Sequence, residues 1–258
     1  MNRSASFNIV RSTSEAFADD VAIEEPLEIR VGDRALSVTL RTPGDDVELA
    51  TGFVITESVV KSQADIDEVR HWGSPNVVRV ALKDGVSVDW QRLQRHFYAT
   101  SSCGVCGKTS IDALRTQSRA IESEVTVSAK TILDLPSRLR GEQQTFDATG
   151  GLHAAAAFDA QGNLLCARED VGRHNAVDKV IGSIVREGQG ASPVVLMLSG
   201  RAGFELIQKA VVARIPIVAA VGAPSSLAVE LAREMNVTLI GFLREERYNI
   251  YSGEQRVR

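Results

Sequence analysis

The sequence contains little cysteine and no long apolar run. Three cysteines in 258 residues, an odd number, make a poor disulfide framework. The longest apolar stretches, at 194–198 and 215–221, are far shorter than the roughly 18 residues that a membrane-spanning helix requires. The segment 1–20 has no continuous apolar stretch, so no secretory signal is expected. We therefore expect a cytoplasmic protein without a membrane partner, whose cysteines serve packing, metal binding or chemistry.

An excess of positive charge is also missing. Lys and Arg number 29 against 33 Asp and Glu, which gives a net charge of −4 and argues against a nucleic-acid partner. Hydrophobic residues at 44% and charged residues at 24% are ordinary for a globular protein and exclude collagen-like, low-complexity and disordered chains. The length is that of one large or two small domains.

The first half of the chain is expected to be rich in strands. Alternating runs at 27–31 and 35–41 around Gly32 predict a hairpin. The apolar spacing predicts a helix over 45–58, and alternation predicts a strand over 77–82. Shorter helices are expected at 90–97 and 109–119.

The second half alternates strands with helices. A helical run ending near residue 140 is followed by paired strands at 151–158 and 164–168. Helices are then expected at 175–186, 204–213 and 226–235, and strands at 194–198, 217–221 and 237–240. Such alternation indicates βαβ units and a parallel section of sheet. We predict an α/β fold, with a smaller strand-rich α+β domain over 1–124 and an α/β domain with a mixed or parallel sheet over 125–258.

The segment TSSCGVCGK places Cys103 and Cys106 two residues apart, between glycines. Gly104 and Gly107 make the backbone permissive, and Lys108 favours the thiolate, the nucleophilic form of cysteine. The motif is compatible with structural cysteines, half of a zinc site shared between subunits, a dithiol redox pair, or carriage of sulfur or an acyl group. The motif alone does not choose among these. Cys166 lies in an apolar strand and is expected to be a buried small hydrophobe.

Polar residues also gather where predicted elements end. The segment REDVGRHNAVDK lies at a strand-to-helix junction and contributes Asp170, Arg173 and His174 as candidate site residues. His153 follows two glycines at the start of a strand and is a further candidate.

Three loops follow the predicted parallel strands. Ligands of parallel sheets bind outside the carboxyl ends of the strands, where glycine and free N–H groups admit a phosphate and arginine donates two hydrogen bonds to it. The loops therefore predict a nucleotide or diphosphate ligand. Dinucleotide-fold, P-loop and zinc-deaminase signatures are absent from the sequence. The candidate residues of the loops are Ser199, Gly200 and Arg201; Gly222, Ala223 and Ser225; and Phe242, Leu243, Arg244, Glu245, Glu246 and Arg247.

Several long motifs together carry a family resemblance. TSSCGVCG, TGGLHAA and REDVGRHNAVDK occur in this order and closely resemble the FdhD family of formate dehydrogenase accessory sulfurtransferases. The three loops match as well, and the likeness runs from about residue 25 to the C-terminus.

The resemblance implies a function. In that family a cysteine desulfurase supplies sulfane sulfur, which the accessory protein carries as a persulfide. The sulfur passes to a molybdenum or tungsten bis-molybdopterin guanine dinucleotide, the bound substrate, before formate dehydrogenase receives it. The persulfide residue falls on Cys103, paired with Cys106, and the guanine-dinucleotide segment falls on 242–247. In that segment, Leu243, Glu245 and Glu246 are not residues expected beside a phosphate.

The family's larger domain is similar in fold to cytidine deaminases without their zinc ligands, and its members form homodimers. No tightly held metal of the protein's own is therefore expected. A non-catalytic chaperone of the molybdenum cofactor is the alternative function, because it would need the arginine loops but not the thiol.

Overall fold

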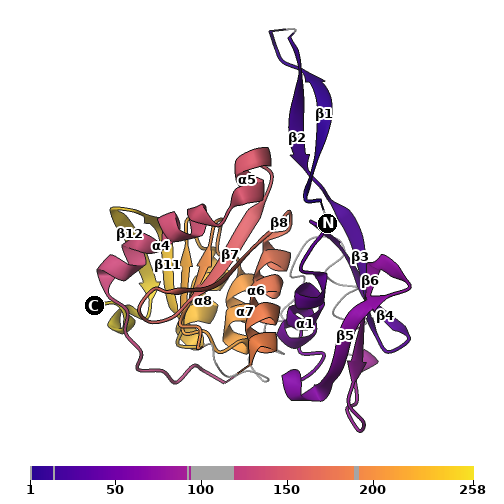
Figure 1. Ribbon diagram of the computed structural model, residues 1–258. Helices are drawn as coiled ribbons and strands as arrows, with labels where there is room; N and C mark the ends of the chain where they lie inside the picture. The colour runs from indigo at the N-terminus through magenta and orange to yellow at the C-terminus, as the bar shows by residue number, and fades with distance from the viewer. Residues whose placement is uncertain (1, 14, 92, 94–118, 189–191) are drawn as a thin grey trace.

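The computed structural model describes residues 2–13, 15–91, 93, 119–188 and 192–258 (Figure 1). Cys103, Cys106 and most of the helices predicted at 90–97 and 109–119 lie outside these described residues.

A six-stranded mixed sheet forms the larger part of the fold, in the order β12-β11-β10-β9-β7-β8. β9, β10 and β11 run parallel, whereas β7 is antiparallel to both of its neighbours. β8 consequently points the same way as β9, and the carboxyl ends of β8 to β11 reach one edge together. The strands are β7 (His153–Phe158), β8 (Leu164–Asp170), β9 (Val195–Leu198), β10 (Ile217–Ala220), β11 (Thr238–Arg244) and β12 (Arg247–Ser252).

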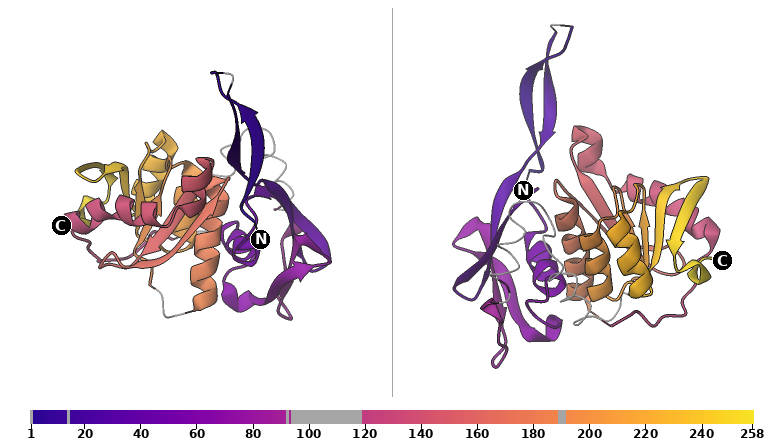
Figure 2. Two further views of the ribbon diagram at one scale, coloured as in Figure 1. Left: turned by 45° about the horizontal axis from the view of Figure 1, so that its top comes forward. Right: turned by 180° about the vertical axis from the view of Figure 1, so that it is seen from behind.

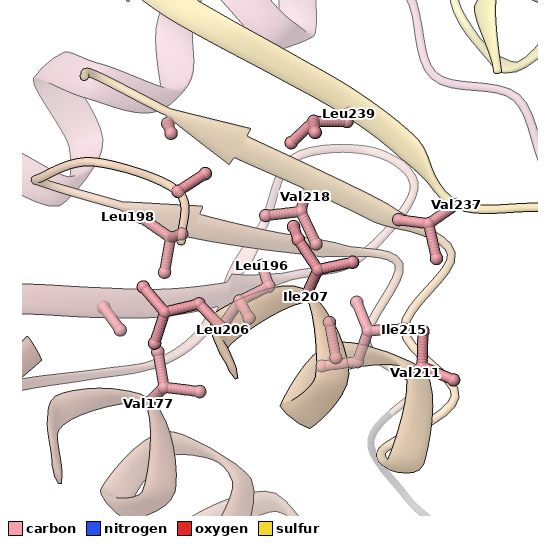
Figure 3. Packing of buried hydrophobic residues seen from close by; sticks show 14 of the residues in the cluster. Val177, Leu196, Leu198, Leu206, Ile207, Val211, Ile215, Val218, Val237 and Leu239 are labelled. Carbon is pink, nitrogen blue, oxygen red and sulfur yellow. The ribbon is translucent and has the colours of Figure 1, made fainter. Parts of the chain in front are cut away.

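Helices cover both faces of this sheet. α6 (Arg173–Glu187), α7 (Phe204–Val212) and α8 (Ser226–Glu234) pack on one face, and α4 (Ala129–Gly141) packs on the other. Successive β9 residues point to opposite faces: Leu196 and Leu198 join the first core, shown in Figure 3, and Val195 and Met197 join the second. A strand buried on both faces reads as a continuous apolar run, which is why this strand was predictable.

A second sheet has the order β4-β3-β6-β5. Its inner face, with Leu27, Ile29 and Val78, packs on α1 (Asp46–Thr56). Its strands are β3 (Glu25–Val31), β4 (Arg34–Arg41), β5 (Ile66–Trp72) and β6 (Ser74–Leu82).

Two further pieces complete the described fold. β1 (Ser4–Val10) and β2 (Ala16–Ala22) pair as an antiparallel ribbon that extends away from the body, and the short α5 (Gln144–Thr149) lies near its base (Figures 1 and 2). The remaining elements are two 3-10 turns, η1 (Gln63–Asp65) and η2 (Glu254–Arg256).

The predicted α/β class is confirmed. The elements predicted from the first hairpin to α8 are also confirmed within the described residues, with shifts of a few residues at their ends, whereas the helices predicted at 90–97 and 109–119 stay predictions. β1, β2, β5, α5 and β12 were not predicted. The prediction for the last loop was wrong in part, because β11 continues to Arg244 and turns directly into β12. The boundary at 124/125 and the cytidine-deaminase likeness stay predictions.

Helices α1 and α6 join the two sheets through an unusually close contact. A Cβ atom on Gly52 of α1 would overlap the carbonyl oxygen of Asp178, and one on Gly182 of α6 would overlap that of Glu48. Figure 2 shows α1 lying between the smaller sheet and α6. Two backbones therefore touch where other helix pairs are separated by side chains.

This contact predicts that a Gly→Ala substitution here destabilises the protein, the opposite of its usual effect in a helix. Gly→Ala inside a helix ordinarily stabilises by about 0.5–1 kcal/mol. Gly52→Ala should instead lower the free energy of unfolding by at least about 1 kcal/mol, because the overlapping atom belongs to backbone that cannot rotate away. Urea unfolding measures the difference. Gly141→Ala, where nothing lies within 4 Å of the added Cβ, is the control. Equal stability of the two variants would contradict the close contact.

Candidate functional site

The predicted site residues gather at the carboxyl edge of the parallel strands. His153, the first residue of β7, pairs in register with Asp170, the last residue of β8. Ser199 extends the β7–β9 ladder: its N–H donates to Ala154 O (3.0 Å), and the N–H of Ala154 donates to Ser199 Oγ (2.8 Å). The adjacent loop joins by a hydrogen bond from Gly222 N to Gly200 O (2.9 Å). One continuous edge therefore runs from β8 to β10.

A pocket of about 1080 Å³ opens at this edge. Its lining combines the strand ends with the β11–β12 turn and with the α4–α5 region. Eight predicted residues line it: His153, Ser199, Gly200, Leu243, Arg244, Glu245, Glu246 and Arg247. Arg201, Gly222, Ala223, Ser225, Phe242, Asp170, Arg173 and His174 are not among its lining residues.

His153 forms part of the pocket wall and touches the glycine loop. A Cβ atom on Gly200 would come within 3.3 Å of His153 Nδ1, a tight contact, so glycine at position 200 eases the close approach of the loop to the ring. Burial lowers the pKa of His153, and the positive charge of Arg173 lowers it further, with smaller contributions from His174 and Arg201; Asp170 acts in the opposite direction. The neutral imidazole is thus favoured in a cationic neighbourhood.

His174 connects this neighbourhood to α7. Its Nε2 lies 3.7 Å from Glu205 Oε2, an ion-pair separation longer than a hydrogen bond. The His174 side chain is the largest influence on Glu205, and together with the Glu205 backbone N–H it lowers the pKa of this carboxyl to about 2 despite partial burial. Nε of Arg173 and Nε2 of His174 are buried and have no hydrogen-bond partner among the described residues.

The arginines of the edge differ in how far they are engaged. The Arg244 Nη1 donates to Val221 O (2.6 Å) and to Leu243 O (2.9 Å), which fixes its guanidinium across two strand ends. Arg201, Arg244 and Arg247 are all exposed. Arg244 offers a charge that its two hydrogen bonds position at the pocket.

The β11–β12 turn requires a correction to the predicted contacts. Leu243 is fully buried in the core beneath α4, so its side chain cannot be a principal ligand contact. Phe242 is 44% exposed and has a positive φ of 53°, and the register of β11 and β12 shifts between Gly241 and Arg244. The extra residue of this bulge turns Phe242 outward.

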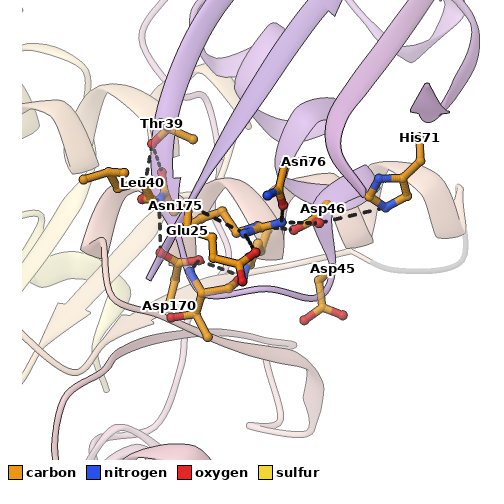
Figure 4. A network of polar contacts seen from close by, with 12 residues as sticks. Glu25, Thr39, Leu40, Asp45, Asp46, His71, Asn76, Asp170 and Asn175 are labelled. Carbon is orange, nitrogen blue, oxygen red and sulfur yellow. Dashed lines mark hydrogen bonds and ion pairs between the residues drawn. The ribbon is translucent and has the colours of Figure 1, made fainter. Parts of the chain in front are cut away.

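Asp170 has a structural role that its position in the motif did not reveal. Its carboxylate is fully buried, accepts from Thr42 N (3.1 Å) and pairs with Lys179 Nζ at 2.7 Å. Asn175 donates to Leu40 O (2.7 Å) and to Asp170 Oδ1 (3.0 Å), as Figure 4 shows. We therefore remove Asp170 from the ligand contacts and assign it to the junction between the two sheets.

Other charges of the same motif join this junction. Arg168 donates to both carboxylate oxygens of Glu48 (2.6 and 2.8 Å), and Asp178 pairs with Lys209 Nζ at 2.9 Å. Lys209 also donates to Thr56 Oγ1 of α1 (2.9 Å). The charge density of REDVGRHNAVDK is thus used mainly to join α1 and β4 to the larger sheet.

The second loop is held by its own contacts. Ser225 begins α8 by accepting the N–H of Ala228 (3.2 Å). A Cβ on Gly222 would collide with the backbone of Gly200 and Arg201. Ala223 accepts the N–H of Ala202 (3.2 Å). These residues shape the edge beside the pocket.

The pocket also contains residues that sequence reasoning missed. They come from α4, α5 and the turn after α5: Arg140, Gln143, Phe146, Gly150 and Gly151 among them. No local motif marks Arg140, Gln143 or Phe146, whereas Gly150 and Gly151 belong to the TGGLHAA motif. Its amphipathic helix was predicted, but the packing of its end onto the strand edge depends on the tertiary fold.

Comparison with known proteins identifies the family of this chain. The FdhD/NarQ family model matches residues 22–258. The chain belongs to the FdhD/NarQ family. A sulfur carrier protein FdhD from Mycolicibacterium paratuberculosis is 50% identical over 250 residues, covering 93% of this chain and 92% of the relative. The FdhD of Streptomyces coelicolor is 49% identical over 251 residues, covering 93% and 89%.

A solved structure supports the fold of this FdhD/NarQ chain. The Desulfotalea psychrophila protein, named a formate dehydrogenase accessory protein, superposes with a TM-score of 0.79 over 99% of this chain and 98% of its own, at 23% identity. The predicted family resemblance is confirmed. Within the described residues, no helix has both the length and the apolarity needed to cross a membrane.

The environment of His153 predicts its titration. In NMR spectra, assigned with a His153→Gln variant, the pKa of His153 should lie below the ordinary value of about 6.5. Arg173→Gln should raise that pKa, because it removes the positive charge that lowers the pKa most, whereas Arg186→Gln in the last turn of α6 should not. A pKa at or above the ordinary value that does not respond to Arg173→Gln would contradict the described surroundings.

Proposed function

We propose that this FdhD/NarQ protein is a sulfur carrier that acts in the maturation of formate dehydrogenase. Its close relatives are named sulfur carrier protein FdhD, and this naming is the observation that carries the proposal. In the proposed reaction, sulfur moves from a cysteine desulfurase to Cys103 and then to a molybdenum or tungsten bis-molybdopterin guanine dinucleotide. The recipient is the catalytic subunit of a formate dehydrogenase, and the carrier acts as a homodimer.

The loading step is thiol exchange on a sulfane sulfur. The Cys103 thiolate attacks the terminal sulfur of the desulfurase persulfide, a new S–S bond forms, and the donor cysteine leaves as a thiolate. No electrons are gained or lost in this step. Lys108, next along the chain after the CGVCG segment, favours the thiolate that the step requires.

Release of the sulfur as sulfide needs two electrons, which the second cysteine can supply. Attack of the Cys106 thiolate on Sγ of persulfidated Cys103 forms a Cys103–Cys106 disulfide and expels hydrosulfide. An external thiol then reduces the disulfide. This assigns Cys106 a relay role that comes after loading.

The pocket at the strand edge supports the proposal because its size and chemistry suit one nucleotide end of the proposed substrate. Its volume of about 1080 Å³ is at the upper end of small-molecule sites. Ser199 and Gly200 line the pocket together with Arg244 and Arg247, whose guanidinium groups provide donors for a phosphate. Glu245 and Glu246 repel phosphate, so the diphosphate would lie on the Arg244 side, away from the tip of the turn.

The first functional prediction concerns the thiol. Cys103→Ala should abolish the 32-dalton additions that mass spectrometry detects after incubation with a desulfurase and cysteine. The variant should also fail to activate formate dehydrogenase. Cys166→Ala is the control, since burial raises the pKa of this thiol to about 11 and removes it from sulfur chemistry. Full activation by Cys103→Ala would instead favour the non-catalytic cofactor chaperone.

Cys106→Ala separates loading from release. The variant should gain the 32-dalton addition as the wild type does, but it should activate formate dehydrogenase more slowly. A variant that neither loads nor activates would contradict the relay role.

The third functional prediction concerns the phosphate contacts. Arg244→Ala should weaken the binding of guanosine diphosphate by about 1.5–3 kcal/mol, the usual worth of a hydrogen bond to a charged group. Arg201→Ala should have a smaller effect, because Arg201 does not line the pocket. Isothermal titration calorimetry measures both. Equal affinities of both variants and the wild type would move the phosphate site elsewhere.

A further inference from the structure

The end of α4 and the following α5 form one wall of the pocket, and nothing in the sequence motifs assigns a role to it. The guanidinium carbon of Arg140 lies over the Phe146 ring, 4.8 Å from its centre, at the distance of a cation–π contact. Both residues line the pocket together with Gln143. Arg140 is half exposed, which leaves its guanidinium accessible to a ligand.

This wall is fixed from behind by a buried carboxylate. Glu169 of β8 is 4% exposed and accepts the N–H groups of Thr145 (2.9 Å) and Phe146 (2.8 Å) at the start of α5. At the other end, Gly150 closes the helix in the left-handed conformation and donates to Phe146 O (2.7 Å). Phe146 is therefore held at both ends of its short helix before any ligand arrives.

The positive charge of Arg140 is already partly neutralised within the protein. Arg140 forms an ion pair with Asp147, so it is less suited to a phosphate than Arg244, whose Nη1 donates only to neutral carbonyls. What Arg140 still offers is the flat face of a guanidinium backed by an aromatic ring. Such faces bind planar heteroaromatic rings by stacking.

We propose that Arg140 and Phe146 bind a planar heteroaromatic ring of the ligand, and that Glu169 is the residue that positions Phe146. This inference rests on the proposed function, in which the pocket takes a nucleotide-bearing substrate. A purine base and a pterin share the required chemistry. In this proposal the α4–α5 wall binds the ring, and the strand edge with Arg244 binds the phosphates.

The test separates the ring from the phosphates by calorimetry with two probes, guanosine diphosphate and inorganic pyrophosphate. Arg140→Lys keeps the charge but removes the planar group, and Phe146→Leu removes the ring behind it. Each substitution should weaken the binding of guanosine diphosphate by about tenfold, as expected for a lost stacking contact, and leave the binding of pyrophosphate unchanged. Phe146→Tyr, which keeps a ring, should retain wild-type affinity.

Two variants serve as further comparisons. Arg138→Lys, on the same helix but bound to Gly162 O and outside the pocket, should change neither affinity. Glu169→Gln should weaken the binding of guanosine diphosphate without affecting the binding of pyrophosphate. Because Glu169 is buried, the melting temperature of the Glu169→Gln variant is measured as well. If that variant does not fold, the Arg140 and Phe146 variants decide the proposal.

The outcomes are distinct. Unchanged binding of guanosine diphosphate by Arg140→Lys and Phe146→Leu, with normal binding by the wild type, would overturn this inference and leave the proposed function standing. Equal weakening of both probes would also overturn it, since Arg140 would then be a phosphate contact. A wild type that binds neither probe would contradict the proposed function itself. A third probe, 6-carboxypterin, separates the two rings: sensitivity of its binding to the same variants assigns the wall to a pterin as well as a purine.

Discussion

Two glycines, Gly52 in α1 and Gly182 in α6, set how near the smaller sheet comes to the larger one. Each lies against a backbone carbonyl of the other helix, so a side chain at either position would separate the sheets. The position of α6 against α1 also affects the pocket edge, because α6 begins there. The first turn of α6 places Arg173 and His174 beside His153, and the electrostatics of the edge therefore depend on how α6 is seated against α1.

The buried charges of the junction act in the same direction. An isolated charge in a protein interior is costly, and a buried pair recovers that cost only when its geometry and hydrogen bonds are good. Lys179 meets this condition with Asp170 and Thr42 O, and Lys209 meets it with Asp178 and Thr56. Each of these two ion pairs lies on the side of the larger sheet, and its bond to Thr42 or Thr56 crosses to the other side, so a displaced arrangement would leave a buried ion pair with fewer hydrogen bonds. The junction is thus specified as well as stabilised.

Prediction from the sequence succeeded where local patterns determine structure. β9 and β10 are apolar runs, and a pocket at their carboxyl ends follows from the rule for parallel sheets. It failed where partners are distant. Asp170 and Asp178 bind Thr42 and Thr56, which lie 128 and 122 residues away in the chain, so no local motif could distinguish these junction charges from ligand contacts. Similarly, β12 is mostly polar and forms only because β11 turns back upon it.

A crystal structure of the chain with guanosine diphosphate tests most directly the central claim that the strand edge and the α4–α5 wall form one substrate site. The account predicts the diphosphate beside Ser199, Gly200 and Arg244, with the guanine ring against Arg140. A nucleotide bound away from this edge, for example in the separate cavity lined by Val59 and Val211, would contradict it.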